Sequence, residues 1–460
     1  MKSMRFVLYL VVLSAMILAA ACGPAPTPQI IEKVVEKTTI VESTRVVEVE
    51  VQVPVQVTEV PQPVKLTMLT HWGEESLMKP MQAKLDEYMA LNPHVTIEYQ
   101  AVTFDQLLPK IATARAAGIS PDIYHFYNLW MPDFAKGGML AVPPPDVLED
   151  IKANYTPGSL QAVTYADTIW GYPTEINTYQ LVYNKKMLKD AGYDKPPATL
   201  AELTEYTCKL TKSSGGKVEV AGMALMPGWD SGVVHPFLSL LWSAGGQYVA
   251  DDLSAALFDS PEGLSVLKYY TDMITQKCID PAIGSFNDFV TGKAAMIIMA
   301  NWFRSTLQAS FVDGYENVGV AQIPTSGSGT PTALQYNWLW GVDNGSPNRD
   351  EAWKLVKWLN TPTAEGQASP MGDYLTSALG AIPSRTSDQV ALKDRLSDEF
   401  MTAYVASAAT AKPEPVYAGG QEIKTALQTE VEAAWYGKKT PEDALKTAAE
   451  EATRILGENK

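Results

Sequence analysis

Acidic side chains are the most abundant residues that could do chemistry, since the chain carries 52 Asp and Glu residues among its 460. Two carboxylates about 5 Å or about 6.5–9.5 Å apart hydrolyse glycosidic bonds, but so many acids single out no pair. The sequence contains none of the motifs H-E-x-x-H, G-x-S-x-G or G-x4-G-K-[ST]. Residues 265–268 match S-x-x-K, but they lie in a helical pattern without the partner motifs. The residues therefore predict no catalytic centre, and an exported glycoside hydrolase stays open as an alternative.

Other reactive residue types are sparse. The four His residues are scattered, which predicts no metal site, and no cofactor is expected. Three Cys exclude a disulfide-framework domain, although Cys208 and Cys278 could pair outside the cytoplasm, and the sequence leaves this open. The formal charge of −16, from 36 basic and 52 acidic residues, disfavours nucleic acid as a partner.

The first 22 residues have the composition of a secretory signal. Lys2 and Arg5 precede an apolar run over residues 6–21, which ends in three Ala before Cys22. This run is shorter than the roughly 20 residues that a membrane-spanning helix needs. The sequence LAAAC resembles a bacterial lipobox, which predicts cleavage before Cys22 and lipidation of this residue. The mature chain would then be lipid-anchored on the extracellular face of the cytoplasmic membrane or in the periplasm; an uncleaved membrane anchor is the alternative.

The composition of residues 23–63 predicts a stalk. Pro24, Pro26 and Pro28 exclude a helix at its start. The Val/Glu/Lys/Thr/Gln quasi-repeat that follows has no aromatic residue and can bury little in a single chain, so we expect an extended tether. Whether the stalk self-associates through its alternating Val residues stays open.

Strand and helix patterns alternate from residue 64 onward. They predict strands at residues 64–69, 95–99 and 121–126, and helices at residues 74–91, 104–117 and 129–137. This succession predicts an α/β fold with a parallel sheet covered by helices. Further helices are predicted at residues 350–359, 388–408, 422–435 and 441–456. Ligands of α/β sheets bind beyond the carboxyl ends of strands, where His71 and Trp72 follow the first strand and Tyr127 and Asn128 follow the third.

Six segments resemble, in order, the sequence pattern of one protein family. They are GISPDIYHFYNLWMPDFAKGGML at 118–140, WGYP with LVYNK at 170–173 and 181–185, AG with PPATLAEL at 191–192 and 196–203, FVTGKAAM at 289–296 with Trp302, NRDEAWKLVKWLN at 348–360, and GAIPSR at 380–385. The chain thereby resembles the extracellular solute-binding proteins of bacterial ABC importers, in the carbohydrate-binding family that includes the maltose-binding protein. Leu200 and Ala300 depart from the pattern, since Trp and Gly are usual at these places.

The resemblance implies an α/β, two-lobe periplasmic-binding-protein-like fold (type II), with the ligand in a cleft between the lobes. Residues 64–173 plus 341–385 would form the first lobe, and residues 174–336 plus 388–460 the second. Strands would cross between the lobes near Tyr172 and Pro173, near residues 337–341 and after Pro383. The implied function is capture of a sugar or oligosaccharide by lobe closure and delivery to the permease subunits of an ABC importer. Which sugar, how many rings and which permease stay open.

The ligand contacts that the resemblance implies lie at aromatic residues with polar neighbours. A pyranose offers an apolar face for stacking and a rim of hydroxyls for hydrogen bonds. Trp302 matches the family's main stacking Trp, and Trp338 or Trp340 would face the cleft from a crossing strand. Arg304 could read an acidic sugar or a phosphate, but a surface position is the commoner outcome for Arg. The same fold with a polyamine, metal or glycerol phosphoester as ligand also stays open, although the many aromatic residues and the lack of clustered Arg, Lys or His favour a neutral sugar. The full predicted ligand-binding set is His71, Trp72, Tyr127, Asn128, Glu175, Trp229, Asp230, Trp302, Trp338 and Tyr417.

Overall fold

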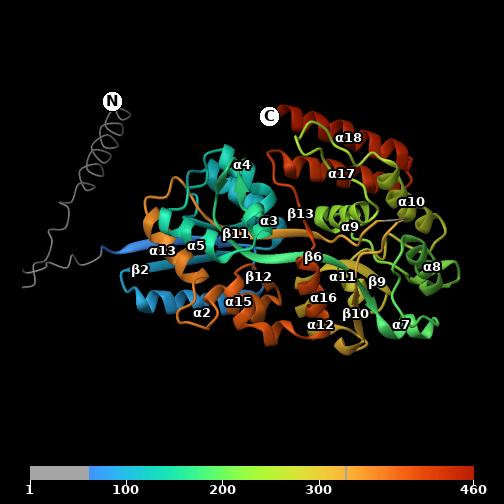
Figure 1. Cartoon of the computed structure of the whole chain (residues 1–460), viewed down its shortest axis with the longest axis horizontal. Coiled ribbons are helices and arrows are strands. Elements are labelled where there is room, and N and C mark those ends of the chain that lie inside the picture. The colour runs from blue at the N-terminus through green and yellow to red at the C-terminus, as the bar shows by residue number, and fades with distance from the viewer. Residues whose placement is uncertain (1–61, 327–328, 460) are drawn as a thin grey trace, which may run out of the picture. The chain divides into compact units, whose positions relative to one another are not determined.

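The computed structural model describes residues 62–326 and 329–459 (Figure 1). The predicted signal segment, Cys22 and the predicted stalk up to residue 61 lie outside this description. The strands are β1 (Val64–Thr70), β2 (Val95–Ala101), β3 (Ile123–Tyr127), β4 (Thr164–Tyr165), β5 (Thr168–Ile169), β6 (Tyr172–Asn184), β7 (Lys212–Ser214), β8 (Lys217–Val220), β9 (Met296–Ala300), β10 (Val318–Ala321), β11 (Leu334–Val342), β12 (Ile382–Pro383) and β13 (Lys412–Pro413).

A nine-stranded mixed sheet organises the fold, with the order β10-β6-β11-β3-β1-β2 along its main path. Strand β1 pairs in parallel with β2 and with β3, as the alternating strand and helix pattern predicts. Strand β11 runs antiparallel to both β3 and β6. The predicted parallel pairing is therefore confirmed for β1, β2 and β3, whereas β11 adds antiparallel pairing to the sheet.

Strand β6 connects two groups of strands. Its first half pairs with β11 and β12, and its second half, from Tyr179, pairs with β9 and β10. Nearly every residue of β6 is buried, so β6 is a core strand of the sheet rather than an edge strand. In Figure 1, β6 and β11 run through the middle of the described chain, with helices on both sides of them.

The helices are α2 (Glu75–Leu91), α3 (Phe104–Ala116), α4 (Met131–Lys136), α5 (Pro145–Asn154), α6 (Pro157–Ala162), α7 (Lys185–Asp190), α8 (Leu200–Leu210), α9 (Asp230–Ser243), α10 (Pro261–Thr275), α11 (Phe286–Val290), α12 (Arg304–Ser310), α13 (Arg349–Asn360), α14 (Pro370–Tyr374), α15 (Thr386–Ala391), α16 (Glu399–Ala408), α17 (Gly420–Trp435) and α18 (Pro441–Glu458). Shorter turns are the 3-10 helices η1 (Asn128–Trp130), η2 (Asn301–Phe303), η3 (Tyr315–Asn317) and η5 (Lys393–Leu396), and the π-helix η4 (Leu375–Leu379).

Local signals explain where the helices begin. Thr440 caps α18 by accepting from the backbone N–H of Asp443, and Pro441 occupies the first helical position. Helix α2 begins at Glu75 and includes Pro80, in agreement with the helix predicted over residues 74–91. The single helix predicted over residues 388–408 is wrong, because α15, η5 and α16 divide this segment.

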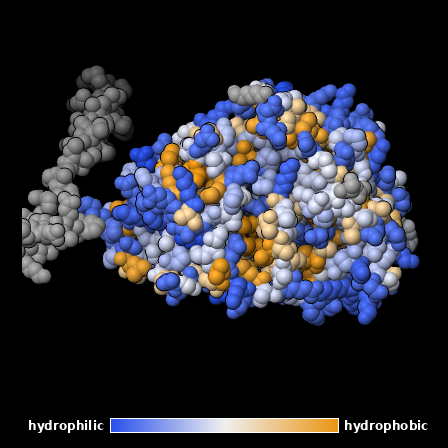
Figure 2. All heavy atoms as spheres, in the orientation of Figure 1, coloured by the Kyte–Doolittle hydropathy of each residue, from blue (hydrophilic) through white to orange (hydrophobic). Residues whose placement is uncertain are grey.

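The C-terminal helices and a disulfide complete the packing. Helices α17 and α18 lie side by side, and α17 also packs on α9 (Figure 1). Cys208 of α8 and Cys278 form a disulfide with their Cα atoms 4.6 Å apart. On the face shown in Figure 2, hydrophilic residues cover most of the described surface, with smaller hydrophobic patches between them.

Candidate functional site

A cavity of about 810 Å³ opens between elements that are distant in the sequence. This volume lies within the range of about 300–1,000 Å³ that is typical of small-molecule sites. Its wall combines the loop after β1, the start of α3, the strands β6 and β11, and the turns around η2 and η4. The lining residues are His71, Trp72, Gly73, Glu74, Ser76, Leu77, Thr103, Phe104, Asp105, Tyr127, Glu175, Asn177, Trp229, Ser231, Phe286, Asn287, Trp302, Ser305, Thr306, Ala309, Ser310, Tyr336, Trp338, Ala378 and Leu379.

Seven of the ten predicted ligand-binding residues line this cavity, namely His71, Trp72, Tyr127, Glu175, Trp229, Trp302 and Trp338. The four Trp residues come from four places: the end of β1, the residue before α9, the turn η2 after β9, and the middle of β11. The structure therefore gathers flat aromatic faces from separate elements around one space. Such faces combine a large contact area with a low entropy cost of ordering.

Trp302 is held by aromatic and polar neighbours. Its indole Nε1 donates to the hydroxyl of Tyr336 over 3.0 Å. Trp229 and Phe286 approach it edge-on, with ring centroids 6.2 Å and 6.1 Å away and interplanar angles of 64° and 87°. These contacts fix the plane of the Trp302 ring and leave the ring half-buried at the cavity wall.

His71 and Trp338 form a stacked pair on another part of the wall. Their ring centroids lie 3.7 Å apart at an interplanar angle of 20°. His125 lies behind them, with its Nδ1 3.4 Å from Nδ1 of His71. Burial, followed by the neighbouring His125, holds the pKa of His71 well below its ordinary value, and burial does the same for the pKa of His125. Both imidazoles are therefore neutral near pH 7.

A β-bulge aims Glu175 at the cavity. Between the pairs Asn337–Ile176 and Leu339–Pro173, two residues of β6 stand opposite the single residue Trp338 of β11. Successive side chains of a regular strand point to opposite faces, whereas here the Thr174 hydroxyl donates to the carboxylate of the next residue, Glu175. Thr174 also contacts Nε2 of His125 at 2.9 Å. Because Pro173 has no N–H to offer to the ladder, a bulge beside it is physically reasonable.

Burial shifts the pKa of the Glu175 carboxyl toward neutral pH. Its exposed fraction is 1%, and burial raises the pKa of its carboxyl to about 7, although the Thr174 hydrogen bond and His71 act in the opposite direction. The nearest imidazole nitrogen, Nε2 of His125, lies 3.7 Å away and is neutral. This carboxyl therefore exists in both protonation states around neutral pH.

Three predicted residues do not line the cavity. Asn128 is fully buried, and its Oδ1 accepts from the backbone N–H of Asn337 over 3.2 Å. Asp230 begins α9, and its Oδ2 accepts from Nε2 of Gln421 over 2.7 Å. Tyr417 is buried in the core before α17. Of the two alternatives on β11, Trp338 faces the cavity, while Trp340 is fully buried against Trp72 and His125.

A buried charge cluster stands behind Tyr127 and was not predicted from the sequence. Nζ of Lys424 lies 3.0 Å from the Tyr127 hydroxyl, 2.8 Å from Ser231 Oγ and 2.8 Å from Nε2 of His235. Glu414 accepts from the Tyr127 hydroxyl and lies 3.7 Å from Lys424 Nζ. Burial alone would raise the pKa of Glu414, but Lys424 and then His235 hold it at about 2. The cluster thus fixes Tyr127 and Ser231, two lining residues, from behind.

Asn177 and Tyr336 are lining residues that sequence reasoning missed. Strand alternation could have found both, because Asn177 lies two residues after Glu175 and Tyr336 two residues before Trp338. Three side-chain atoms of the lining residues have no hydrogen-bond partner within the described chain, namely Nε1 of Trp72, Nε1 of Trp229 and Oδ1 of Asn177. Buried polar atoms without partners carry a free-energy cost, which a ligand with hydroxyl groups could remove.

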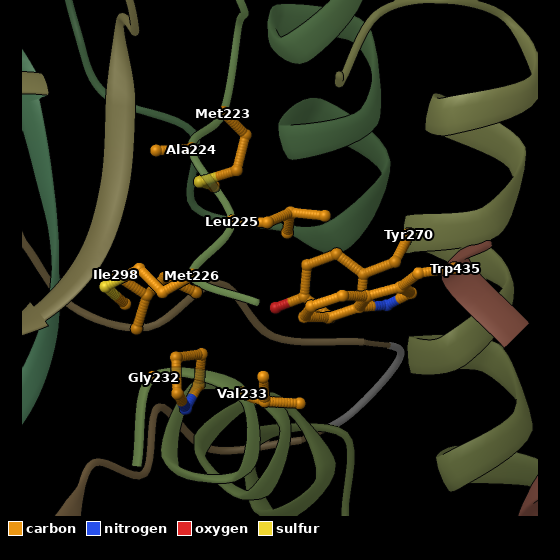
Figure 3. Close-up of a pocket in the computed structure, with 10 residues that line it drawn as sticks. Met223, Ala224, Leu225, Met226, Gly232, Val233, Tyr270, Ile298 and Trp435 are labelled. Carbon is orange, nitrogen blue, oxygen red and sulfur yellow. The ribbon is translucent and has the colours of Figure 1, made fainter. Parts of the chain in front are cut away.

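A second hollow, shown in Figure 3, differs in scale and chemistry. Its volume is about 10 Å³, which is at the limit for a single water molecule. Met226 and Ile298 stand on one side of it, and Tyr270 and Trp435, with ring centroids 5.5 Å apart, stand on the other (Figure 3). We interpret this hollow as a packing gap of the core.

Neither metal ligation nor a membrane span is evident in the part of the chain that the structure describes. Across residues 62–326 and 329–459, no three His, Cys, Asp or Glu side chains are grouped as metal ligands. None of the helices in these ranges combines the length and apolar character needed to cross a membrane.

Comparison with known proteins identifies the family. The family model of bacterial extracellular solute-binding proteins matches residues 72–366, which is more than half of the chain. The maltotriose-binding protein of Pyrococcus abyssi (strain GE5 / Orsay) is 25% identical over 307 residues, covering 64% of this chain and 62% of that protein.

Solved structures share the fold. An ABC transporter solute-binding protein of Thermotoga lettingae TMO, bound with α-D-tagatose, matches with a TM-score of 0.75 and 27% identity, over 85% of this chain and 100% of that one. The GacH receptor of Streptomyces glaucescens GLA.O, solved unliganded and with acarbose, matches with a TM-score of 0.75 and 23% identity, over 87% of this chain and 100% of that one. These matches confirm the predicted α/β two-lobe fold and the resemblance seen in the sequence. The chain belongs to the bacterial extracellular solute-binding protein family.

Proposed function

We propose that this protein captures a sugar or oligosaccharide in the 810 Å³ cavity and delivers it to the permease of an ABC importer. The observation that carries the proposal is the cavity wall, where four Trp faces stand beside hydrogen-bonding groups without partners. The Pyrococcus abyssi relative is a maltotriose-binding protein, and the Thermotoga lettingae structure holds tagatose, which agrees with this ligand class.

Stacking would recognise the ring faces of the sugar, and hydrogen bonds would recognise its hydroxyl groups. Trp302 and Trp229 would stack on the apolar faces of the rings, since their edge-on packing leaves the cavity wall aromatic. Asn177, Glu175 and the indole Nε1 of Trp72 would exchange hydrogen bonds with the hydroxyl rim. Asn128, Asp230 and Tyr417 would act only through the residues they support.

Lobe closure would sequester the ligand. We assign the first lobe to residues 64–173 plus 341–385 and the second to residues 174–336 plus 388–460. The change of partners along β6, from β11 and β12 to β9 and β10, supports a boundary within this strand. A sugar that contacts both lobes stabilises the closed form by its differential affinity for that form.

The protein would act outside the cytoplasm, held at the membrane by a lipid on Cys22 after removal of the signal peptide. The extracellular character of the family and the Cys208–Cys278 disulfide both support this location, because disulfides persist in oxidising compartments. A shift in mass after globomycin treatment of the producing cells would test the lipid on Cys22.

Thermal unfolding of the full chain with a panel of mono- and oligosaccharides tests the function. The chain should be purified in a detergent without a sugar headgroup, because such a headgroup would itself be a ligand. A sugar at 100 times its Kd should add about 2.7 kcal/mol to the free energy of unfolding, which raises Tm by several degrees. The sugar concentration should stay constant over hours. Consumption of the sugar would favour the hydrolase, and no shift with any sugar would contradict the proposal.

A further inference from the structure

The charged residues that line the cavity all have the same sign. They are Glu74 and Asp105, which are exposed at the rim, and the buried Glu175. Lys and Arg are absent from the described residues of the lining. Arg304, next to Trp302, is paired with Asp398 instead, and Lys424 is held behind Tyr127 by the buried charge cluster. The wall therefore offers negative charge to a ligand and no basic group.

Two glutamates of this chain allow a direct comparison. Glu175 and Glu414 are both almost fully buried, with exposed fractions of 1% and 3%. Each has a nitrogen 3.7 Å from a carboxylate oxygen, but for Glu414 this is the cationic Nζ of Lys424 and for Glu175 the neutral Nε2 of His125. The pKa of Glu414 is about 2 and that of Glu175 about 7. Burial acts on both, so the difference follows from the partners of Glu414: Lys424 first, then His235, whose Nε2 lies 3.2 Å away, and the hydroxyl of Tyr127.

The other groups that face Glu175 supply no cation near pH 7, since His71 lowers the pKa of Glu175 only in its protonated form and its own pKa is held well below its ordinary value. They are His71 after β1, His125 on β3, Tyr336 on β11 and Tyr374 on α14. The two imidazoles are neutral because their pKa values are lowered, and burial raises the pKa of both tyrosines, so that they stay neutral as well. Within the described chain, the counter-charge that Lys424 gives to Glu414 has no equivalent at Glu175.

We propose that the ligand supplies this cation, and that it is an amino sugar or amino-substituted oligosaccharide whose ammonium group pairs with Glu175. The inference rests on the proposed function and specifies the class of sugar. Indole faces attract an ammonium group as well as an apolar sugar face, so the four Trp residues of the wall suit both parts of such a ligand. On binding, the protonated carboxyl of Glu175 loses its proton to the solvent, and the carboxylate pairs with the ammonium.

Matched sugar pairs test the inference by titration calorimetry of the full chain at pH 6. The members of each pair differ at one carbon of each ring, which carries an ammonium group in one member and a hydroxyl in the other: glucosamine and glucose, galactosamine and galactose, mannosamine and mannose, and the glucosamine dimer and cellobiose. We expect the amine of the preferred pair to bind about 10-fold more tightly, as for a hydrogen bond with a charged group. We also expect release of up to one proton per bound amine, measured in buffers of different ionisation enthalpy.

Two variants assign the effect to Glu175. Glu175→Gln keeps the shape and the neutral form of the side chain, and it should reduce the preference to below about 2-fold and abolish proton release. Glu87→Gln, at an exposed position of α2 outside the cavity lining, should leave both nearly unchanged. Tighter or equal binding of the hydroxyl sugar, or an unchanged preference in Glu175→Gln, would overturn the inference while the sugar-binding function stands. A lack of binding by every pair would also overturn the inference, and the sugar-binding function would fall with it only if no sugar of the wider thermal-unfolding panel shifted Tm.

Discussion

The indole of Trp302 donates a hydrogen bond to the hydroxyl of Tyr336, with 3.0 Å between the two atoms. Trp302 lies in the turn after β9, and Tyr336 lies in β11, so this bond joins two elements at the wall of the cavity. The hydrogen-bonding capacity of the indole is thereby used within the protein, and its face is left for the ligand. Trp302 is for this reason the aromatic residue whose removal should affect binding most directly.

Replacement of Trp302 by Ala should weaken sugar binding by at least about 1 kcal/mol, because the stacking face is lost. Calorimetric titration with the preferred sugar measures the effect. Trp358→Ala is the matched control, since Trp358 is also half-buried but lies on α13 and is not part of the cavity wall. An affinity of Trp302→Ala equal to that of the wild type would remove Trp302 from the site.

Glu175 should make the unliganded protein less stable as the pH rises. Its pKa is raised from 4.5 to about 7 in the folded state, so the folded state binds the proton more tightly. The resulting stabilisation is complete below about pH 4.5 and is lost as the pH rises through 7, with a total of about 3 kcal/mol. Glu175→Gln should abolish this loss in urea unfolding at pH 5 and pH 8. The exposed Glu74→Gln is the control, and a variant with the slope of the wild type would contradict the assignment.

Lys424→Met should destabilise the protein by about 3–5 kcal/mol, because it leaves the buried carboxylate of Glu414 without its cation. The double variant Lys424→Met with Glu414→Gln should recover most of this loss, since no buried charge remains unpaired. Lys446→Met, at an exposed position of α18, should change the free energy of unfolding by less than about 0.5 kcal/mol. Equal stability of the single and double variants in urea unfolding would exclude a charge effect.

Replacement of Cys208 and Cys278 by Ala should lower the free energy of unfolding by about 2–4 kcal/mol, because the bridge closes a long loop between residues 70 positions apart. Sugar affinity should be preserved, since neither cysteine lines the cavity. In the wild type, alkylation without reductant should label neither of these residues. Labelling of both would show that the bond is absent.

The sequence predicted the parts of the site that depend on local patterns. His71, Trp72 and Tyr127 follow predicted strands, and general rules for α/β sheets place ligands at these ends. Trp302 was found by resemblance to the family, because it follows a recognisable strand. Their location at the cavity agrees with the predictions, and their contacts with a ligand stay predictions.

Other parts of the site depend on tertiary packing. Lys424 and Glu414 resemble surface charges of a helix and a loop, and only the packing of α17 on α9 buries the lysine. Asn128 was expected at the cavity because it follows β3, but the turn η1 directs its amide toward the backbone of β11 instead. Strand alternation predicts the face of Asn177, yet it cannot foresee the bulge that sets the orientation of Glu175.

The bulge in β6 also has a consequence for insertions and deletions. Thr174 and Glu175 together face Trp338, so the strand carries one residue more than a regular ladder needs. Loss of one codon at Thr174 would restore a regular ladder and keep the strand order, but it would remove the hydroxyl that donates to the Glu175 carboxylate. Substitutions in this strand can change which ligand is bound, whereas a one-residue deletion should abolish binding in a protein that still folds. We therefore expect homologues that lack the extra residue of β6 to bind a different class of ligand, even where their overall sequence identity to this chain is high.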